Sequence, residues 1–120
     1  MKRTLLGFGL LTFAGACLSA EVPPAISDMG CTNCHTLHKR DIGPSWTEIA
    51  ERYRDKRNDP ATLEQLVRSI SKGSRDKWGS LPMVANDPAD TKRDQIVAAV
   101  QYILSLPEQP AGTGDKPSGK

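Results

Sequence analysis

The sequence predicts a small all-α domain in which three to five helices are joined by long loops. Apolar residues recur at helical spacing in several segments, and no segment shows the alternation typical of a β-strand. Only 33 of the last 100 residues are apolar, which is thin for a core that must offset the conformational entropy of a domain this size. We therefore expect something other than side chains to fill part of the interior.

Residues 1–20 have the pattern of an export signal that is removed from the mature protein. Lys2 and Arg3 precede an uncharged run, Thr4–Ala20. A basic start, an apolar run and a small residue before a polar stretch are typical of a secretory signal. We expect cleavage after Ala20 and a periplasmic location. Two alternatives remain open: acylation at Cys17, which would make a lipoprotein, and an uncleaved anchor, since the uncharged run is at the lower limit of length for a span.

Length and charge exclude several classes of protein. The 100 residues after the signal hold 14 Lys and Arg against 14 Asp and Glu, and a neutral chain is not an electrostatic nucleic-acid binder. No later segment approaches the ~18 apolar residues that span a bilayer. A segment of this length is expected to form one domain, over residues 21–106. The tail 107–120, rich in Pro, Gly and charge, is expected to be disordered.

The first two helices are predicted from turn and capping residues. A short helix over 25–29 ends at Gly30. The second begins after Ser45, which has Glu48 three positions on, as in a capping box. Its apolar positions follow the i, i+3, i+4, i+7 spacing of one helix face up to residue 53. The polar segment 54–59 is expected to be a loop.

The two later helices have clearer limits. Asp59 is the expected N-cap of the third helix, and Gly73 is expected to end it. Thr91 is expected to cap the last helix, and Pro107 to stop it. Residues 74–90 between them are rich in Gly, Pro, Asp and Ser. They are predicted to form a long loop of the kind that is usually functional or disordered.

One motif carries clear chemistry: Cys31-Thr32-Asn33-Cys34-His35. Two thiols at i and i+3 can each add to a vinyl group of one haem, and the histidine that follows is then held beneath the iron as an axial ligand. The alternatives are a redox dithiol, half of a zinc site and a structural disulfide. The appended histidine, the export signal and the sparse core favour covalent attachment of a haem c, which would fill the interior.

Met83 is the candidate for the other axial position of the iron. His38 and Met29 lie close to the motif in sequence and would struggle to reach across the ring, whereas Met83 lies much further along the chain, inside the long loop. A thioether opposite a histidine raises the reduction potential, and two filled axial positions leave no place for a substrate. The alternative role for Met83 is that of a flexible core filler.

The chain resembles a known family through several features together. These are Gly30 with the CTNCH motif, Gly43-Pro44, the Trp-Gly-Ser-Leu-Pro-Met run ending at Met83, and an amphipathic last helix. Over about residues 22–106 they are similar to the short bacterial class I c-type cytochromes. The resemblance implies the small class I cytochrome c fold wrapped round one covalent haem. It also implies a periplasmic one-electron carrier and not an enzyme.

The resemblance implies roles for three further residues. The carbonyl of Pro44 would accept a hydrogen bond from the His35 imidazole and so orient that ligand. The indole N–H of Trp78 would donate to a haem propionate, and the amide of Asn86 would contact Met83. Trp78 could instead be an ordinary core aromatic, and Asn86 a plain turn residue.

The expected partners are a protein electron donor and a protein acceptor, which dock transiently with a monomer at the exposed haem edge. Two alternatives remain: a haem-bearing subunit or lipid-tethered module of a larger redox complex, and a haem peroxidase or gas sensor with an open iron. An apolar wall should keep water off the iron, and basic loop residues could form a docking ring. The wall residues are Trp46, Leu66, Leu81, Ile96, Val100 and Ile103, and the ring residues are Lys39, Arg40, Lys72, Arg75 and Lys77.

Overall fold

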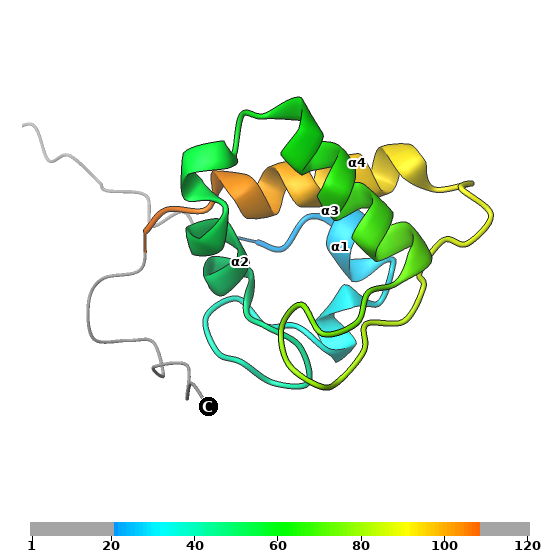
Figure 1. The fold of residues 1–120 in the computed structure, drawn as a ribbon, viewed down its shortest axis with the longest axis horizontal. Coiled ribbons are helices and arrows are strands. Elements are labelled where there is room, and N and C mark those ends of the chain that lie inside the picture. Colours follow the sequence, from blue (N-terminus) through cyan, green and yellow to red (C-terminus); the bar gives the residue numbers. More distant parts are fainter. Residues whose placement is uncertain (1–20, 109–120) are drawn as a thin grey trace, which may run out of the picture.

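The computed structural model describes residues 21–108, which form four α-helices and two 3₁₀ turns (Figure 1). Within this range there is no β-strand, and a single isolated β-bridge joins Ser74 and Met83. The all-α prediction is confirmed. The elements in chain order are α1 (Pro24–Ser27), η1 (Cys31–Asn33), α2 (Trp46–Arg52), η2 (Arg54–Lys56), α3 (Pro60–Lys72) and α4 (Arg93–Ser105).

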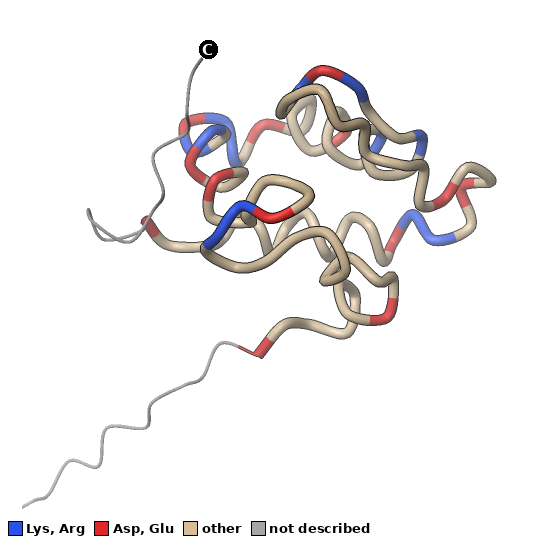
Figure 2. The backbone as a smooth tube through the Cα atoms, turned by 90° about the horizontal axis from the view of Figure 1, so that it is seen from below, with Lys and Arg blue, Asp and Glu red and all other residues tan. Residues whose placement is uncertain are grey.

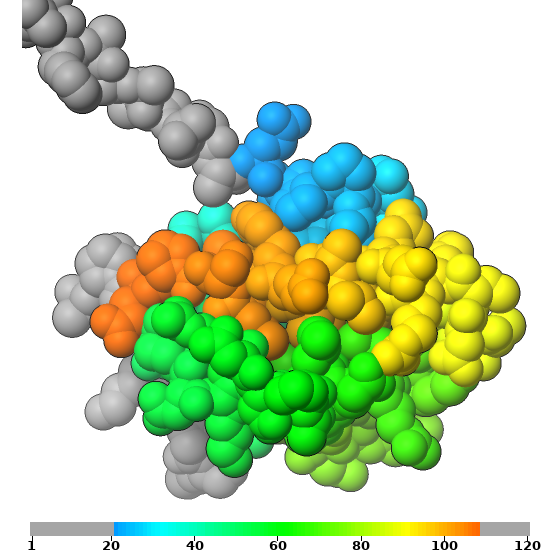
Figure 3. Space-filling view, turned by 90° about the horizontal axis from the view of Figure 1, so that it is seen from above, coloured from blue at the N-terminus to red at the C-terminus, as the bar shows by residue number. Residues whose placement is uncertain are grey.

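Helix α4 is the centre of the fold, because it packs against α1, α2 and α3. In Figure 3 it lies as an orange band between the blue segment that contains α1 and the green segment that contains α3. Ala99 of α4 joins a core with Ile26 of α1 and Trp46 of α2. Ile96 of α4 joins a second core with Val67 of α3. The other three helices thus all pack against α4, which contributes side chains to both cores.

The predicted caps of α2 and α3 are confirmed. The Ser45 hydroxyl accepts a hydrogen bond from the Glu48 backbone N–H at 3.1 Å, and the Glu48 carboxylate accepts from the Ser45 N–H at 3.0 Å. At α3, the Asp59 carboxylate accepts from the first free N–H groups of the helix. Each pair satisfies donors that have no partner inside the helix.

The predicted cap of α4 is wrong. Thr91 is not the N-cap, and the helix begins two residues later, at Arg93. The carboxylate of Asp87 accepts hydrogen bonds from the backbone N–H of Thr91 and of Lys92, at 2.9 and 2.8 Å, and also from the Thr91 hydroxyl. The Asp87 side chain therefore takes the place of a cap for the backbone N–H groups just before α4. The Thr91 hydroxyl, which was expected to be the cap, donates to Asp87 instead.

Two other boundaries differ slightly from the prediction. Helix α1 ends at Ser27 and not at Met29, because residues 28–30 form a turn in which Gly30 has a φ of +69°. This left-handed conformation favours glycine. The segment after α2, expected to be a loop, contains the single 3₁₀ turn η2.

The expected export signal over 1–20 lies outside the described residues, as do residues 109–120 of the expected tail. Within 21–108, no helix is both long enough and apolar enough to cross a membrane.

Candidate functional site

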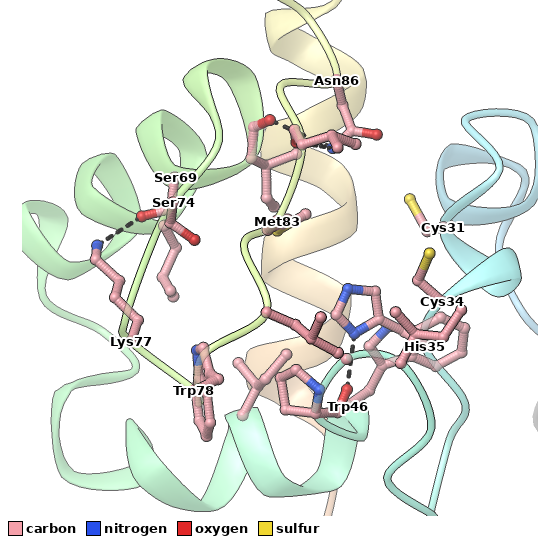
Figure 4. A pocket seen from close by; sticks show the side chains of 18 of the residues that line it. Cys31, Cys34, His35, Trp46, Ser69, Ser74, Lys77, Trp78, Met83 and Asn86 are labelled. Atoms are coloured by element: carbon pink, nitrogen blue, oxygen red, sulfur yellow. Dashed lines mark hydrogen bonds between the residues drawn. The ribbon is translucent and has the colours of Figure 1, made fainter.

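A cavity of about 490 Å³ opens between the helices and two loops, 36–44 and 74–86. Its volume falls in the range of cofactor and ligand sites, ~300–1,000 Å³. All seven side chains predicted to form the site line this one cavity, although they come from distant parts of the sequence (Figure 4). They are Cys31, Cys34, His35, Pro44, Trp78, Met83 and Asn86.

The two cysteines face the cavity together because of the turn that carries them. Cys31–Asn33 form the 3₁₀ turn η1, closed by hydrogen bonds to the Cys31 carbonyl from the backbone N–H of Cys34 and of His35. Side chains three residues apart lie on the same side of a 3₁₀ turn. Both sulfur atoms therefore point into the same space (Figure 4), and both thiols are free.

His35 is oriented by the loop that follows it. Its Nδ1 lies 2.7 Å from the Pro44 carbonyl oxygen. A carbonyl can only accept, so Nδ1 carries the proton and Nε2 keeps a free lone pair. Gly43 is the close neighbour that allows this arrangement, because a Cβ at that position would lie 2.5 Å from Cε1 of the ring. The ring is thus oriented by Nδ1, which leaves Nε2 as the nitrogen that could bind a metal.

Met83 enters the cavity from the 74–86 loop, on a different wall from the cysteines (Figure 4). The two ends of this loop are joined by paired backbone hydrogen bonds between Ser74 and Met83, at 3.0 and 2.9 Å. Gly73 has a φ of +79°, and a Cβ there would lie 2.7 Å from the Met83 carbonyl oxygen. Gly73 therefore does more than end α3, since it makes room for the backbone of Met83.

Asn86 anchors the segment after Met83 to the end of α3. Its backbone N–H donates to the Ile70 carbonyl at 3.0 Å, and its side-chain amide donates to the Val84 carbonyl at 3.0 Å. The loop thereby satisfies a carbonyl that the helix end leaves without an intrahelical partner. The contact between Asn86 and the Met83 side chain stays a prediction.

Two arginines that the sequence did not single out for this role hold the tip of the 74–86 loop. The Arg52 guanidinium stacks over the Trp78 ring at 4.3 Å from its centroid and donates to the Lys77 carbonyl at 2.7 Å. The Arg40 guanidinium donates to the Trp78 carbonyl at 2.8 Å and to Glu48 at 2.7 Å. The Trp78 ring thus contacts α2 through Arg52, and its carbonyl is linked to α2 through Arg40, which pairs with Glu48.

The environment of the cysteines does not suit two of the alternatives, a redox dithiol and a zinc site. Burial raises the pKa of the Cys31 thiol, and the neighbouring Cys34 adds to the effect, although a backbone hydrogen bond opposes it. The nucleophile of a redox dithiol has a lowered pKa, so this trend is the opposite of what that function requires. No group of three or more Cys, His, Asp or Glu side chains within 21–108 could hold a metal ion.

The expected apolar wall is largely confirmed, but Ile96 and Leu81 are exceptions. Trp46, Val100 and Ile103 are buried and line the cavity, and Leu66 lines it half-buried. Ile96 is buried in the core with Val67 and does not line the cavity, and 67% of the Leu81 surface is exposed. The apolar lining of the cavity thus includes both buried side chains and an exposed one.

The expected basic docking ring is also altered by intramolecular contacts. Arg40 pairs with Glu48, Lys72 pairs with Asp90, and Lys77 donates to the Ser69 hydroxyl. Acidic and basic residues also lie side by side along the loops that carry them (Figure 2). These contacts leave the region without a continuous basic face.

The comparison with known families agrees with this geometry, since the family model for cytochrome c matches residues 24–107. The chain belongs to the cytochrome c family. Cytochrome c-552 of Hydrogenobacter thermophilus is 30% identical over 110 residues, covering 88% of this chain and 99% of that protein. Cytochrome c-552 of Nitrosomonas europaea is 36% identical over 114 residues, with the same two shares.

A solved structure shows the same architecture. The crystal structure of wild-type cytochrome c552 from Nitrosomonas europaea matches with a TM-score of 0.61 at 28% identity, and the match covers 69% of this chain and 96% of that one. The present protein is a small class I cytochrome c, and the cofactor of this family is a covalently bound haem c.

The residues of the cavity fit a haem c. Two free thiols on one side of a turn match two thioether links, and an imidazole whose Nδ1 is bonded to the Pro44 carbonyl offers its Nε2 to an iron. Gly43 leaves room for that imidazole where any larger residue would displace it. The walls supply the apolar surroundings that a macrocycle requires.

Proposed function

We propose that this cytochrome c is a one-electron carrier of the periplasm whose iron takes His35 and Met83 as its two axial ligands. The observation that carries the proposal is that a histidine with a free Nε2 and a methionine line the same cavity from different segments. Haem c, when bound, supplies the one-electron couple of the iron. The protein supplies the position of the ligands and the exclusion of water.

The two proposed ligands are held by backbone contacts that do not depend on the oxidation state of the iron. Pro44 and Gly43 fix the His35 ring, and the bridge to Ser74 fixes the backbone of Met83. Ligands held in this way need to move little when an electron arrives or leaves. With both axial positions filled, the iron offers no coordination site for a substrate, which supports transfer of electrons and not catalysis.

We propose that protein donors and acceptors dock at the mouth of the cavity. Three large apolar side chains of the described residues are exposed, Ile42, Leu81 and Val84, and all three line this cavity. An apolar surface at the cofactor edge suits the small, short-lived interfaces of electron carriers. This surface, and not the basic ring expected from the sequence, is the proposed contact region of a monomeric carrier.

The proposed domain organisation follows the sequence pattern. Residues 1–20 would be removed on export, 21–106 would form the haem domain, and 107–120 would remain as a tail. The match of the family model to residues 24–107 supports the extent proposed for the haem domain.

Replacing the proposed distal ligand tests this function directly. The ferric form of the purified holoprotein should show a far-red charge-transfer band between sulfur and iron, and Met83→Ala should abolish it and lower the reduction potential. Met29→Ala is the matched control, because Met29 lines the same cavity and its loss should leave the band in place. An unaltered protein that is high-spin and binds carbon monoxide avidly would contradict the proposal.

A further inference from the structure

One pair of polar side chains on the cavity wall has no part in the function proposed above. The ammonium of Lys77, in the 74–86 loop, donates to the Ser69 hydroxyl of α3 at 2.8 Å (Figure 4). Both residues line the cavity, next to Trp78. The Ser69 hydroxyl donates its own proton to the Gln65 carbonyl at 2.9 Å, so toward Lys77 it can act only as an acceptor. Two of the three ammonium protons of Lys77 remain available.

Lys77 forms no ion pair within the described residues, although Asp41 and Asp76 also line the cavity. Two basic side chains line the cavity. Arg40 forms an ion pair with Glu48, whereas no carboxylate of residues 21–108 lies within ion-pair distance of Lys77. An ammonium group held by a neutral hydroxyl at the edge of a mostly apolar cavity is suited to receive an anion from whatever fills that cavity.

The backbone that carries Lys77 is held firmly. Arg52 donates to the Lys77 carbonyl at 2.7 Å and stacks on the ring of Trp78, and Arg40 donates to the Trp78 carbonyl at 2.8 Å. The indole N–H of Trp78, which can only donate, has no acceptor among the described residues. Two donors that lack an anionic or carbonyl partner therefore sit on adjacent, fixed residues.

We propose that Lys77, steadied by Ser69, binds a propionate carboxylate of the haem beside the indole of Trp78. This rests on the proposed function only in requiring a haem in the cavity, and it does not depend on Met83 being a ligand. The haem carries two carboxylates, and one ammonium would neutralise one of them. The site would couple the charge of Lys77 to the redox equilibrium.

The direction of that coupling follows from electrostatics. A cation beside a propionate favours its ionised form and so lowers its pKa, and a cation near the iron disfavours the ferric state. Loss of Lys77 should therefore lower the reduction potential and move the pH at which the potential begins to fall to a higher value. The other charged groups facing this region are Arg40, Asp41, Arg52 and Asp76, and they are unchanged in the variants below.

The test is to measure the reduction potential of the holoprotein against pH for Lys77→Gln and for a charge-matched control. Arg75→Gln removes one positive charge from the same loop, but Arg75 does not line the cavity. Lys77→Gln should shift the equilibrium for electron exchange between the protein and a reference redox couple toward the ferric protein by about threefold to tenfold. A tenfold shift corresponds to about 59 mV for one electron. Arg75→Gln should change it by much less, and added salt should remove most of that smaller effect.

Two further variants separate a direct contact from a general charge effect. Lys77→Arg should have a reduction potential and a pH profile close to those of the unaltered protein. Ser69→Ala changes no charge, and it should shift both part of the way toward the values of Lys77→Gln. The inference is overturned if Lys77→Gln and Arg75→Gln have the same potential and the same pH profile. Failure of the Met83 proposal would show independently, as the missing far-red band of the unaltered protein.

Discussion

At the scale of single residues, Asp87 organises a turn by accepting three hydrogen bonds. Only 3% of its surface is exposed. Burial by itself would raise the pKa of this carboxyl, but hydrogen bonds from the backbone of Lys92 and Thr91 and from the Thr91 hydroxyl, with the nearby charge of Lys72, bring the pKa below its ordinary value. The ionised form is therefore the one that stabilises the folded state.

We expect Asp87→Asn to lower the midpoint of thermal unfolding of the holoprotein at neutral pH, because an amide supplies one acceptor oxygen in place of two. A carboxyl whose pKa is lowered by folding contributes stability above its unfolded-state pKa of ~4, and that contribution is lost as the pH falls through the folded-state pKa. The gap in midpoint between the two proteins should therefore shrink below about pH 4.

Asp90→Asn is the matched control for this prediction. Asp90 lies in the same loop, is exposed, and has a positive φ that asparagine also tolerates. Its ion pair with Lys72 is on the surface, where such pairs contribute little. Equal effects of the two substitutions at neutral pH would show that Asp87 has no special role.

The site residues that could be predicted from the sequence are those whose role depends on neighbours close in the chain. Cys31, Cys34 and His35 carry their chemistry in their spacing, so the motif alone indicated a haem. The role of Gly43 could not be predicted in the same way, because it depends on the ring of His35 folding back against a residue eight positions later. Asp87 was missed because Thr91 has the more usual capping sequence.

At the scale of elements, the 74–86 loop is held at both its base and its tip. The base is joined by the Ser74–Met83 bridge, and the tip is fastened to α2 by Arg40 and Arg52. The sequence predicted the loop and its functional character. It contained no sign of the arginines in this role, because side-chain contacts to backbone atoms 25 and 38 positions away leave no periodic pattern.

We expect Arg52→Ala to loosen the tip of this loop without unfolding the helices. The substitution removes a cation–π contact, worth about 0.5–1 kcal/mol at an exposed site, together with a hydrogen bond to the Lys77 carbonyl. Amide hydrogen exchange of residues 77–80 should become about fivefold faster. Exchange in α4 should stay as it is.

Arg93→Ala serves as the comparison, because Arg93 forms a surface ion pair with Glu64 that links α4 to α3 and lies away from the loop. It should leave exchange in the loop unchanged. Unaltered exchange at 77–80 in Arg52→Ala would mean that the stacking on Trp78 does not restrain the loop.

At the scale of the whole molecule, the cavity explains the sparse apolar composition. The helices and the two loops surround a cavity of about 490 Å³ lined mostly by apolar side chains. A haem c seated there would bury that apolar lining, which favours the folded state by about 25 cal/mol per Å² of apolar surface removed from water. The macrocycle therefore belongs to the core of the holoprotein.

We therefore expect the double variant Cys31→Ser/Cys34→Ser, produced without haem, to lack a cooperative thermal transition by circular dichroism. Cys17→Ser is the control, since it removes a thiol from the segment expected to be cleaved. It should load haem and unfold cooperatively. A sharp transition in the haem-free double variant would show that the side chains alone can form the core.

The overall architecture was the most predictable property of the chain. Helical periodicity and capping residues indicated three to five helices, and the low apolar content indicated that something other than side chains fills part of the interior. The packing of α4 against α2 and α3 could not be deduced, because it depends on which faces of the helices meet and not on any one segment.

The separation of the two halves of the site along the chain also sets an order of assembly. Cys31, His35 and Pro44 meet within the short segment 31–44, whereas Met83 lies far beyond it in the sequence. The length-dependent entropy cost of closing the chain is about 3.4 kcal/mol between His35 and Met83, against about 1.9 kcal/mol between His35 and Pro44. During folding, the half around Cys31 should form first and the 74–86 loop should close last, and on heating the same loop should be the first part to open.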